Sequence, residues 1–171
     1  MSIQKVLIAL LAAVLIIGLP VLTHAENTPI VGNVQTRCLI TTDTNGVFGN
    51  PLPSKLSTAS ADGGVVPVIR YDVTLADAYL AKVTTPTGFS TSPSLSDSVT
   101  WTGSTAVSKT SDAAMSGYEA AKVTYGSTTQ FDLTKAGSTW FSSTATAVYG
   151  VSKSFPGGSY TAIVLAECIA K

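Results

Sequence analysis

Apolar and polar side chains alternate along several short runs of this chain, and the clearest run covers residues 65–75. There Ile69, Tyr71 and Val73 alternate with Arg70 and Asp72. A period of two places alternate side chains on opposite faces of a strand, so this run predicts a β-strand with one buried and one solvent-facing side. Such strands are typical of antiparallel sheets.

Further runs of this kind are separated by clusters of Gly, Pro, Asn, Ser and Thr. The pattern predicts an all-β fold, an immunoglobulin-like two-layer antiparallel β-sandwich of about 7–9 strands in a single domain of residues 26–171. Residues 76–83 fit either two helical turns, because Ala and Leu favour helix, or a strand, which we prefer because no N-cap precedes them. The other predicted strands are residues 34–38, 98–102, 117–125, 129–134, 139–149 and the run from 159 to the end of the chain.

The first 25 residues have the pattern of a secretory signal peptide. A short start with Lys5 leads to an apolar run over residues 6–22, and Ala25 precedes the charged Glu26. Such a segment is removed on export. A retained membrane anchor is the alternative, but the run is short for a span and Gly18 and Pro20 interrupt it. We therefore expect a secreted protein, extracellular or at the cell surface, without a stable membrane span.

Two cysteines, Cys38 and Cys168, stand near the two ends of the predicted domain. In an exported chain, two cysteines indicate one disulfide more than a metal site, which needs further ligands, and two buried free thiols are the alternative. A disulfide here would tie the first predicted strand to the last. Closing a loop of this size stabilises a fold by roughly 4–5 kcal/mol in the chain-entropy model.

Charge and histidine content exclude several function classes. The chain holds ten Lys and Arg, of which Lys5 belongs to the leader, against ten Asp and Glu, and its one histidine is His24 in the leader. Without a basic cluster we expect no nucleic-acid partner. Without histidine there is no Ser-His or Cys-His pair, so we expect neither catalysis nor a cofactor. A pair of carboxylates could still hydrolyse glycosides, but the acids fall beside turns and on solvent-facing sides.

One short segment of the sequence partly matches the pattern of a calcium-binding loop. Asp43, Asn45 and Gly46 resemble its beginning, but Val47 stands where the next oxygen donor belongs and no acid follows within the loop. The segment 43–53 is therefore predicted as a turn cluster that ends the first strand, with no metal.

Trp140 and Phe141 are adjacent aromatic residues within a predicted strand, so their rings point to opposite sides. One ring would then be exposed and could form a platform for a glycan or another ligand. Packing in the core is the ordinary use of large aromatic residues and is the favoured interpretation.

Two terminal segments carry a resemblance to a known family. Residues 31–41, with Gly32 ahead of a strand bearing Cys38, resemble the opening of bacterial chaperone–usher pilins, and residues 158–171, with Gly158 and alternating apolar positions, resemble their closing strand. This chain differs from the family in having its second cysteine on the last strand and Ala170 in place of the penultimate aromatic residue. The resemblance implies an incomplete sandwich that polymerises when the N-terminal arm of one subunit adds to another. The candidate arm residues are Thr28, Pro29, Ile30, Val31 and Val34.

These features together predict a non-enzymatic extracellular structural subunit. We expect identical subunits to assemble by strand addition into a pilus-like filament or a surface layer. The alternative is a secreted carbohydrate- or ligand-binding module that uses Trp140 and Phe141. A third and weaker hypothesis is an inhibitor or periplasmic accessory factor.

Overall fold

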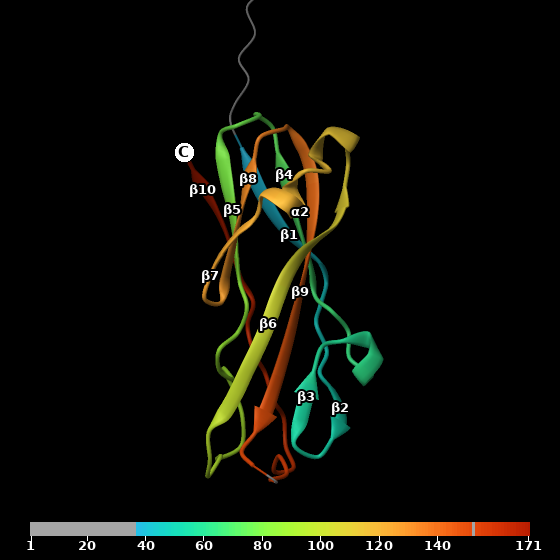
Figure 1. Ribbon diagram of the computed structural model, residues 1–171, viewed down its shortest axis with the longest axis vertical. Helices are drawn as coiled ribbons and strands as arrows, with labels where there is room; N and C mark the ends of the chain where they lie inside the picture. The colour runs from blue at the N-terminus through green and yellow to red at the C-terminus, as the bar shows by residue number, and fades with distance from the viewer. Residues whose placement is uncertain (1–36, 152) are drawn as a thin grey trace, which may run out of the picture. The chain divides into compact units, whose positions relative to one another are not determined.

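The computed structural model describes residues 37–151 and 153–171, which form ten strands and three short helical turns (Figure 1). In chain order these are β1 (Cys38–Thr44), β2 (Gly49–Leu52), β3 (Lys55–Ser57), η1 (Ser60–Asp62), β4 (Val68–Val73), β5 (Tyr79–Thr84), β6 (Val99–Thr110), η2 (Ala113–Met115), α2 (Tyr118–Ala121), β7 (Val123–Tyr125), β8 (Thr128–Leu133), β9 (Gly137–Tyr149) and β10 (Leu165–Ala170).

The first sheet is built around β9, its longest strand. On one side β9 pairs with β6 along most of its length, and on the other it pairs first with β4 and then with β3. β1 extends the sheet beyond β4, and β2 extends it beyond β3. The second sheet has the order β10-β5-β8-β7, and all pairs in both sheets are antiparallel. The predicted fold class, an all-β antiparallel sandwich, is confirmed, with ten strands in the described ranges instead of seven to nine.

The core lies between the sheets and follows the predicted period of two. Residues Ile69, Tyr71 and Val73 of β4 are buried, as are Phe131 on β8 and Phe141 on β9. The ring centroids of Phe131 and Phe141 lie 4.3 Å apart, and those of Tyr71 and Phe141 lie 5.3 Å apart. Alternation over residues 65–75 therefore identified the buried side of β4.

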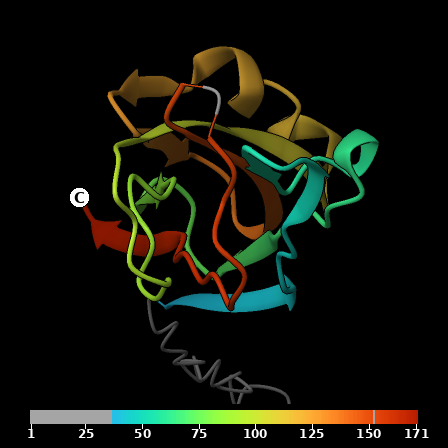
Figure 2. The same cartoon turned by 90° about the horizontal axis from the view of Figure 1, so that it is seen from below.

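The two sides of the sandwich are closed in different ways. Viewed along the strands, β1 and β10 lie on one side, opposite α2 and β7 (Figure 2). β1 and β10 are edge strands of different sheets, and no strand of the described ranges lies between them. The candidate site is found on this side.

The predicted strand over residues 117–125 is wrong in its first half, which forms α2. Alanine-rich sequence favours helix, and Glu119 and Lys122 form an ion pair one turn apart. The buried Tyr118 anchors this turn, since its hydroxyl accepts a hydrogen bond from the Lys135 N–H at 2.9 Å. Strand β7 is what remains of the prediction. The preference for strand in residues 76–83 is confirmed by β5.

The segment 43–53 was predicted as a turn cluster, but it contains the end of β1 and all of β2. The side-chain amide of Asn50 donates to the carbonyl oxygens of Leu52 and Lys55, at 2.7 and 2.9 Å, and so closes the β2–β3 hairpin. Side-chain bonds to the main chain leave no mark on the apolar pattern, which explains why this hairpin was missed.

The last strand is shorter than predicted. It begins at Leu165, which pairs with Thr84 at the end of β5. Pro86 follows Thr84 closely, and because proline has no N–H to donate, β5 cannot continue as a pairing partner. Residues 159–164 therefore run without a neighbouring strand, apart from one bridge between Thr161 and Thr91.

Candidate functional site: a groove beside the disulfide

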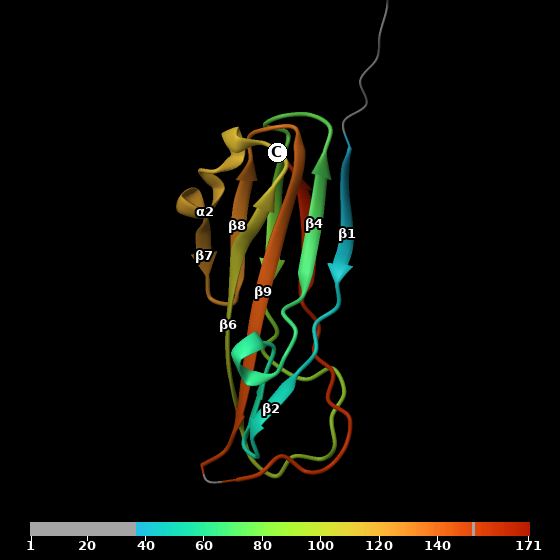
Figure 3. The same cartoon turned by 90° about the vertical axis from the view of Figure 1, so that its right-hand side faces the viewer.

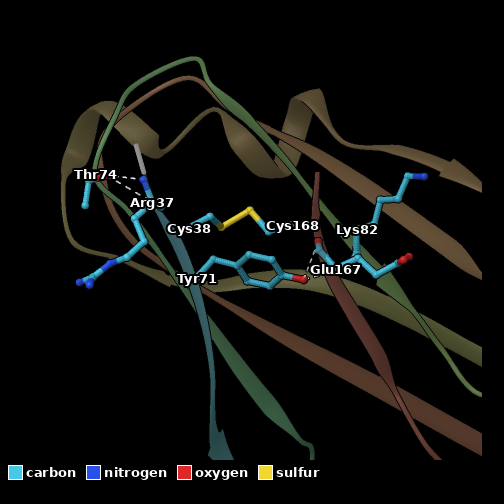
Figure 4. The surroundings of a disulfide bond; sticks show 7 residues. All are labelled: Arg37, Cys38, Tyr71, Thr74, Lys82, Glu167 and Cys168. Carbon is cyan, nitrogen blue, oxygen red and sulfur yellow. Dashed lines mark hydrogen bonds between the residues drawn. A yellow bond between two sulfur atoms is a disulfide. The ribbon is translucent and has the colours of Figure 1, made fainter. Parts of the chain in front are cut away.

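A disulfide joins the edges of the two sheets. Cys38 of β1 and Cys168 of β10 are bonded, with their Cα atoms 6.5 Å apart (Figure 4). The predicted pairing is confirmed, and no free cysteine is found in the described ranges. Both side chains pack against the core. The two layers are thus covalently closed at the end of the open side where β1 begins and β10 ends.

Tyr71 ties the layers together beside the disulfide. Its ring is fully buried, and its hydroxyl lies 2.9 Å from the carbonyl oxygen of Lys82 and 3.2 Å from that of Glu167, to which it donates (Figure 4). Burial raises the pKa of Tyr71 well above its usual value, so the hydroxyl stays protonated and keeps this donor role. A side chain of the first sheet therefore bonds to β5 and β10 of the second.

A groove opens along the same side, beyond the disulfide. One wall is formed by residues 42 and 44–48, from the end of β1 and the turn after it, and the other by residues 158 and 160–164, which lead into β10. Its volume is about 640 Å³. The floor is the inner side of the first sheet, with Leu56, Ile69 and Ala145. The groove exists because β5 and β10 cover only part of that sheet.

The groove is uncharged, and its rim carries both apolar side chains and hydroxyl or amide side chains. None of its lining residues is Asp, Glu, Lys, Arg or His. At the rim, the side chain of Val47 is 54% exposed and that of Ile163 is 63% exposed. An exposed apolar residue on each wall, beside neutral polar ones, suits an uncharged partner that can both pack and hydrogen-bond.

An aromatic cluster packs at the end of the groove away from the disulfide. The ring of Phe89 lies at its centre, 4.7 Å from Trp101, 5.0 Å from Tyr160 and 5.9 Å from Phe155 between centroids. Phe48 adds an edge contact at 6.2 Å. Edge-to-face packing of this kind stabilises the loops that replace the second sheet here. Tyr160 belongs both to this cluster and to the groove wall.

The two residues of the predicted ligand platform point to opposite sides of β9. Phe141 is completely buried in the core, so its ring is not accessible to a ligand. Trp140 points outward, where its indole N–H donates to Asp43 at 2.5 Å and the amine of Lys109 lies 4.7 Å from the ring centroid. The outward ring agrees with the strand geometry, but its N–H and one face are already engaged within the protein. A ligand role for Trp140 stays a prediction.

Metal-binding groups do not converge in the described ranges. No group of three or more His, Cys, Asp and Glu side chains there could hold an ion. Asp43, considered above as a calcium ligand, instead accepts the bond from Trp140 and lies 3.7 Å from Arg70. Among the helices of residues 37–151 and 153–171, none is long and apolar enough to cross a membrane.

The predicted leader and the candidate arm lie outside the described residues. These are residues 1–25 for the leader and Thr28, Pro29, Ile30, Val31 and Val34 for the arm.

The groove itself was missed by sequence reasoning. A signal for it does exist, since Pro86 comes three residues after a predicted strand, and residues 156–164 contain no charge and begin with a Pro-Gly-Gly turn. Where one strand of a pair ends early, the rest of the other strand is left without a pairing partner. Nothing in the sequence alone, however, places β5 beside β10.

Comparison with known proteins does not identify a family. No family model matches the chain, and no curated protein or solved structure matches it either.

Proposed function

We propose that this protein is a non-enzymatic structural subunit that is exported and assembles with identical copies by strand addition. The observation that carries the proposal is the uncharged groove between residues 42–48 and 158–164, where the edges of the two sheets are left without a strand. An added strand would supply main-chain hydrogen bonds to the unpaired segment and cover the exposed side chains of Val47 and Ile163.

The N-terminal arm has the composition that such a groove requires. If the leader ends at Ala25, residues 27–36 form an uncharged stretch between Glu26 and Arg37. In an extended chain Ile30 and Val34 point to the same side, so they would enter the groove together while their neighbours face water. An uncharged segment can be buried in an uncharged groove without the cost of desolvating an unpaired charge.

The disulfide makes insertion at its own level difficult. Neighbouring strands in a sheet lie about 4.8 Å apart, so a strand inserted between two others separates them by nearly twice that distance. At Cys38 and Cys168 the two Cα atoms are 6.5 Å apart. The added strand is therefore expected beyond the disulfide, along residues 42–48.

Electron microscopy of the exported protein tests this proposal. The unaltered protein is expected to form filaments or ordered layers in negative stain. Ile163→Asp, which places a charge on the groove wall, and Ile30→Asp, which places one in the arm, should each abolish them. Leu52→Asp is the matched control, because Leu52 is 57% exposed and does not line the groove. Assembly that survives both charge substitutions would overturn the proposal.

A ligand-binding module is the second candidate, and the size of the groove favours it. Small-molecule pockets typically enclose about 300–1,000 Å³, and this groove falls within that range. The outward Trp140 offers a separate, shallower surface. Glycan-array binding that is lost in Trp140→Ala, from a protein that stays monomeric at every concentration, would favour this candidate over assembly.

A further inference from the structure

β6 is an edge strand, so the main-chain N–H and C=O groups of successive residues point alternately toward β9 and away from the sheet. Its even-numbered residues face β9, as the Gly150 N–H bonded to the Ser98 carbonyl oxygen at 3.0 Å indicates. The N–H and C=O groups of Val99, Trp101, Gly103, Thr105 and Val107 therefore point away from the sheet. β6 lies on the side of β9 away from β4 and β1.

Two side chains, one in α2 and one just after its C-terminus, form hydrogen bonds with the outward main-chain groups at one end of β6. The carboxylate of Glu119 accepts the Val107 N–H at 2.8 Å, and the amine of Lys122 donates to the Thr105 carbonyl oxygen at 2.9 Å. Glu119 and Lys122 also bond to each other. We call this pair the clasp. It occupies the positions that a neighbouring strand would otherwise fill.

The part of β6 before Thr105 has no such protection. Figure 3 shows α2 and β7 beside the far half of β6. Within the described ranges, the outward main-chain groups of Trp101 and Gly103 have no partner. Gly103 is exposed, and residues 99–107 contain no charge and no proline. The pairing of β6 with β9 is regular until a bulge between Val107 and Lys109. Charges, prolines and bulges are the usual means of blocking an edge, and none is present here.

We propose that this free half of β6 pairs with the same edge of a second copy. Because an edge strand run antiparallel to itself presents matching donors and acceptors, the pair is closed by a two-fold axis. With the clasp blocking Thr105, the pairing is centred on Trp101, and Val99 lies opposite Gly103 of the other copy. The absence of charge favours an identical neutral edge over a charged partner.

This register places the outward hydroxyl side chains against one another. Thr100 and Thr102 lie on the outer face of the first sheet and are both exposed. In the pair, Thr100 lies directly opposite Thr102 of the second copy, at the close spacing of a non-hydrogen-bonded pair. Charges introduced at these two positions therefore meet across the interface and leave the core of each copy unchanged.

Sedimentation velocity of charge-swapped variants tests the pairing. All proteins carry Ile163→Asp, so that association through the groove is removed. The parent is expected to form a concentration-dependent dimer. Thr100→Lys with Thr102→Lys, and Thr100→Glu with Thr102→Glu, should each raise the dimer Kd about tenfold, because like charges face each other. An equimolar mixture of the two variants should recover the dimer as a heterodimer.

Two further variants keep the test specific to this edge. Thr87→Lys with Ser94→Lys adds the same charge to exposed loop positions and should leave the parent dimer unchanged. Lys122→Ala opens the clasp and should strengthen dimerisation. A parent that stays monomeric to its highest soluble concentration, or a mixture of the Lys and Glu variants that fails to recover the dimer, would overturn the proposal.

Discussion

Cys38 and Cys168 are bonded across the gap between the two sheets, one on the edge strand β1 and the other on the edge strand β10. They stand 130 residues apart in the chain, so the bond encloses almost the whole domain. It also sets where the open side begins, since the groove lies beyond it. The same feature thus stabilises the fold and limits the surface through which assembly is proposed.

Removing the disulfide is expected to destabilise the fold strongly. For a loop of this size, Cys38→Ala with Cys168→Ala should lower the free energy of unfolding by roughly 4–5 kcal/mol, because the unfolded chain regains its freedom. Urea unfolding of the variant and of the oxidised protein measures the difference. Equal midpoints and equal slopes for the two proteins would contradict this expectation.

The Tyr71 hydroxyl is expected to contribute less to the free energy of unfolding than the disulfide does. Tyr71→Phe keeps the buried ring but leaves the carbonyl oxygens of Lys82 and Glu167 without this donor, at a cost of about 1 kcal/mol. Tyr125→Phe is the matched control, because Tyr125 is 65% exposed and its variant should match the unaltered protein. A loss of stability in the control as large as that in Tyr71→Phe would refute a specific role for this bond.

Adjacent aromatic residues on β9 should behave very differently. Phe141→Ala removes a fully buried ring and should cost about 3–5 kcal/mol. Trp140→Ala removes the bond to Asp43 and the contact with Lys109 at the surface, which together are worth about 1–2 kcal/mol. The free energies of unfolding, compared in the same buffer, check the order. A larger loss of stability for Trp140→Ala than for Phe141→Ala would contradict this order.

Stability should fall in acid. The hydrogen bond from Lys55 lowers the pKa of Asp62, and the Ser98 N–H together with Lys153 lowers the pKa of Asp97. Burial raises the pKa of Glu119, but hydrogen bonds from Lys122 and the Val107 N–H outweigh it and leave the pKa below its usual value.

A carboxyl group whose pKa is lower in the folded state stabilises the fold at pH values above its pKa in the unfolded chain. This contribution is lost as the pH falls through its pKa in the folded state. The free energy of unfolding should therefore be steady near neutrality and decline below about pH 4. Unfolding curves recorded across that range measure the decline, and Asp97→Asn should flatten part of it. Stability that rises on acidification would contradict the assignment.

The sequence predicted the layers better than the edges. Alternation over residues 65–75 identified Tyr71 as a core residue, because a period of two places alternate side chains on the face of the strand that is buried. The pairing of Cys38 with Cys168 followed from their number and from the predicted export. These features depend on local pattern or on counting.

The clasp and the groove were not predicted, because both depend on which strands are neighbours in the fold. The clasp at β6 was missed because residues 117–125 were interpreted as a strand, whereas the buried Tyr118 and the pair formed by Glu119 and Lys122 hold a helical turn. The groove was missed because its cause is the early end of β5, and the partner of β5 is decided by the tertiary fold. Local propensity contains neither relationship.

Photo-cross-linking from the arm tests the central claim most directly. A benzophenone amino acid replaces Ile30 in the exported protein, and one half of the preparation is labelled with a heavy nitrogen isotope. After irradiation, mass spectrometry should find links from position 30 to residues 42–48 or 158–164, with pairs of mixed isotope as abundant as pairs of a single isotope. Links that avoid the groove, or that join only chains of the same isotope, would contradict assembly by strand addition.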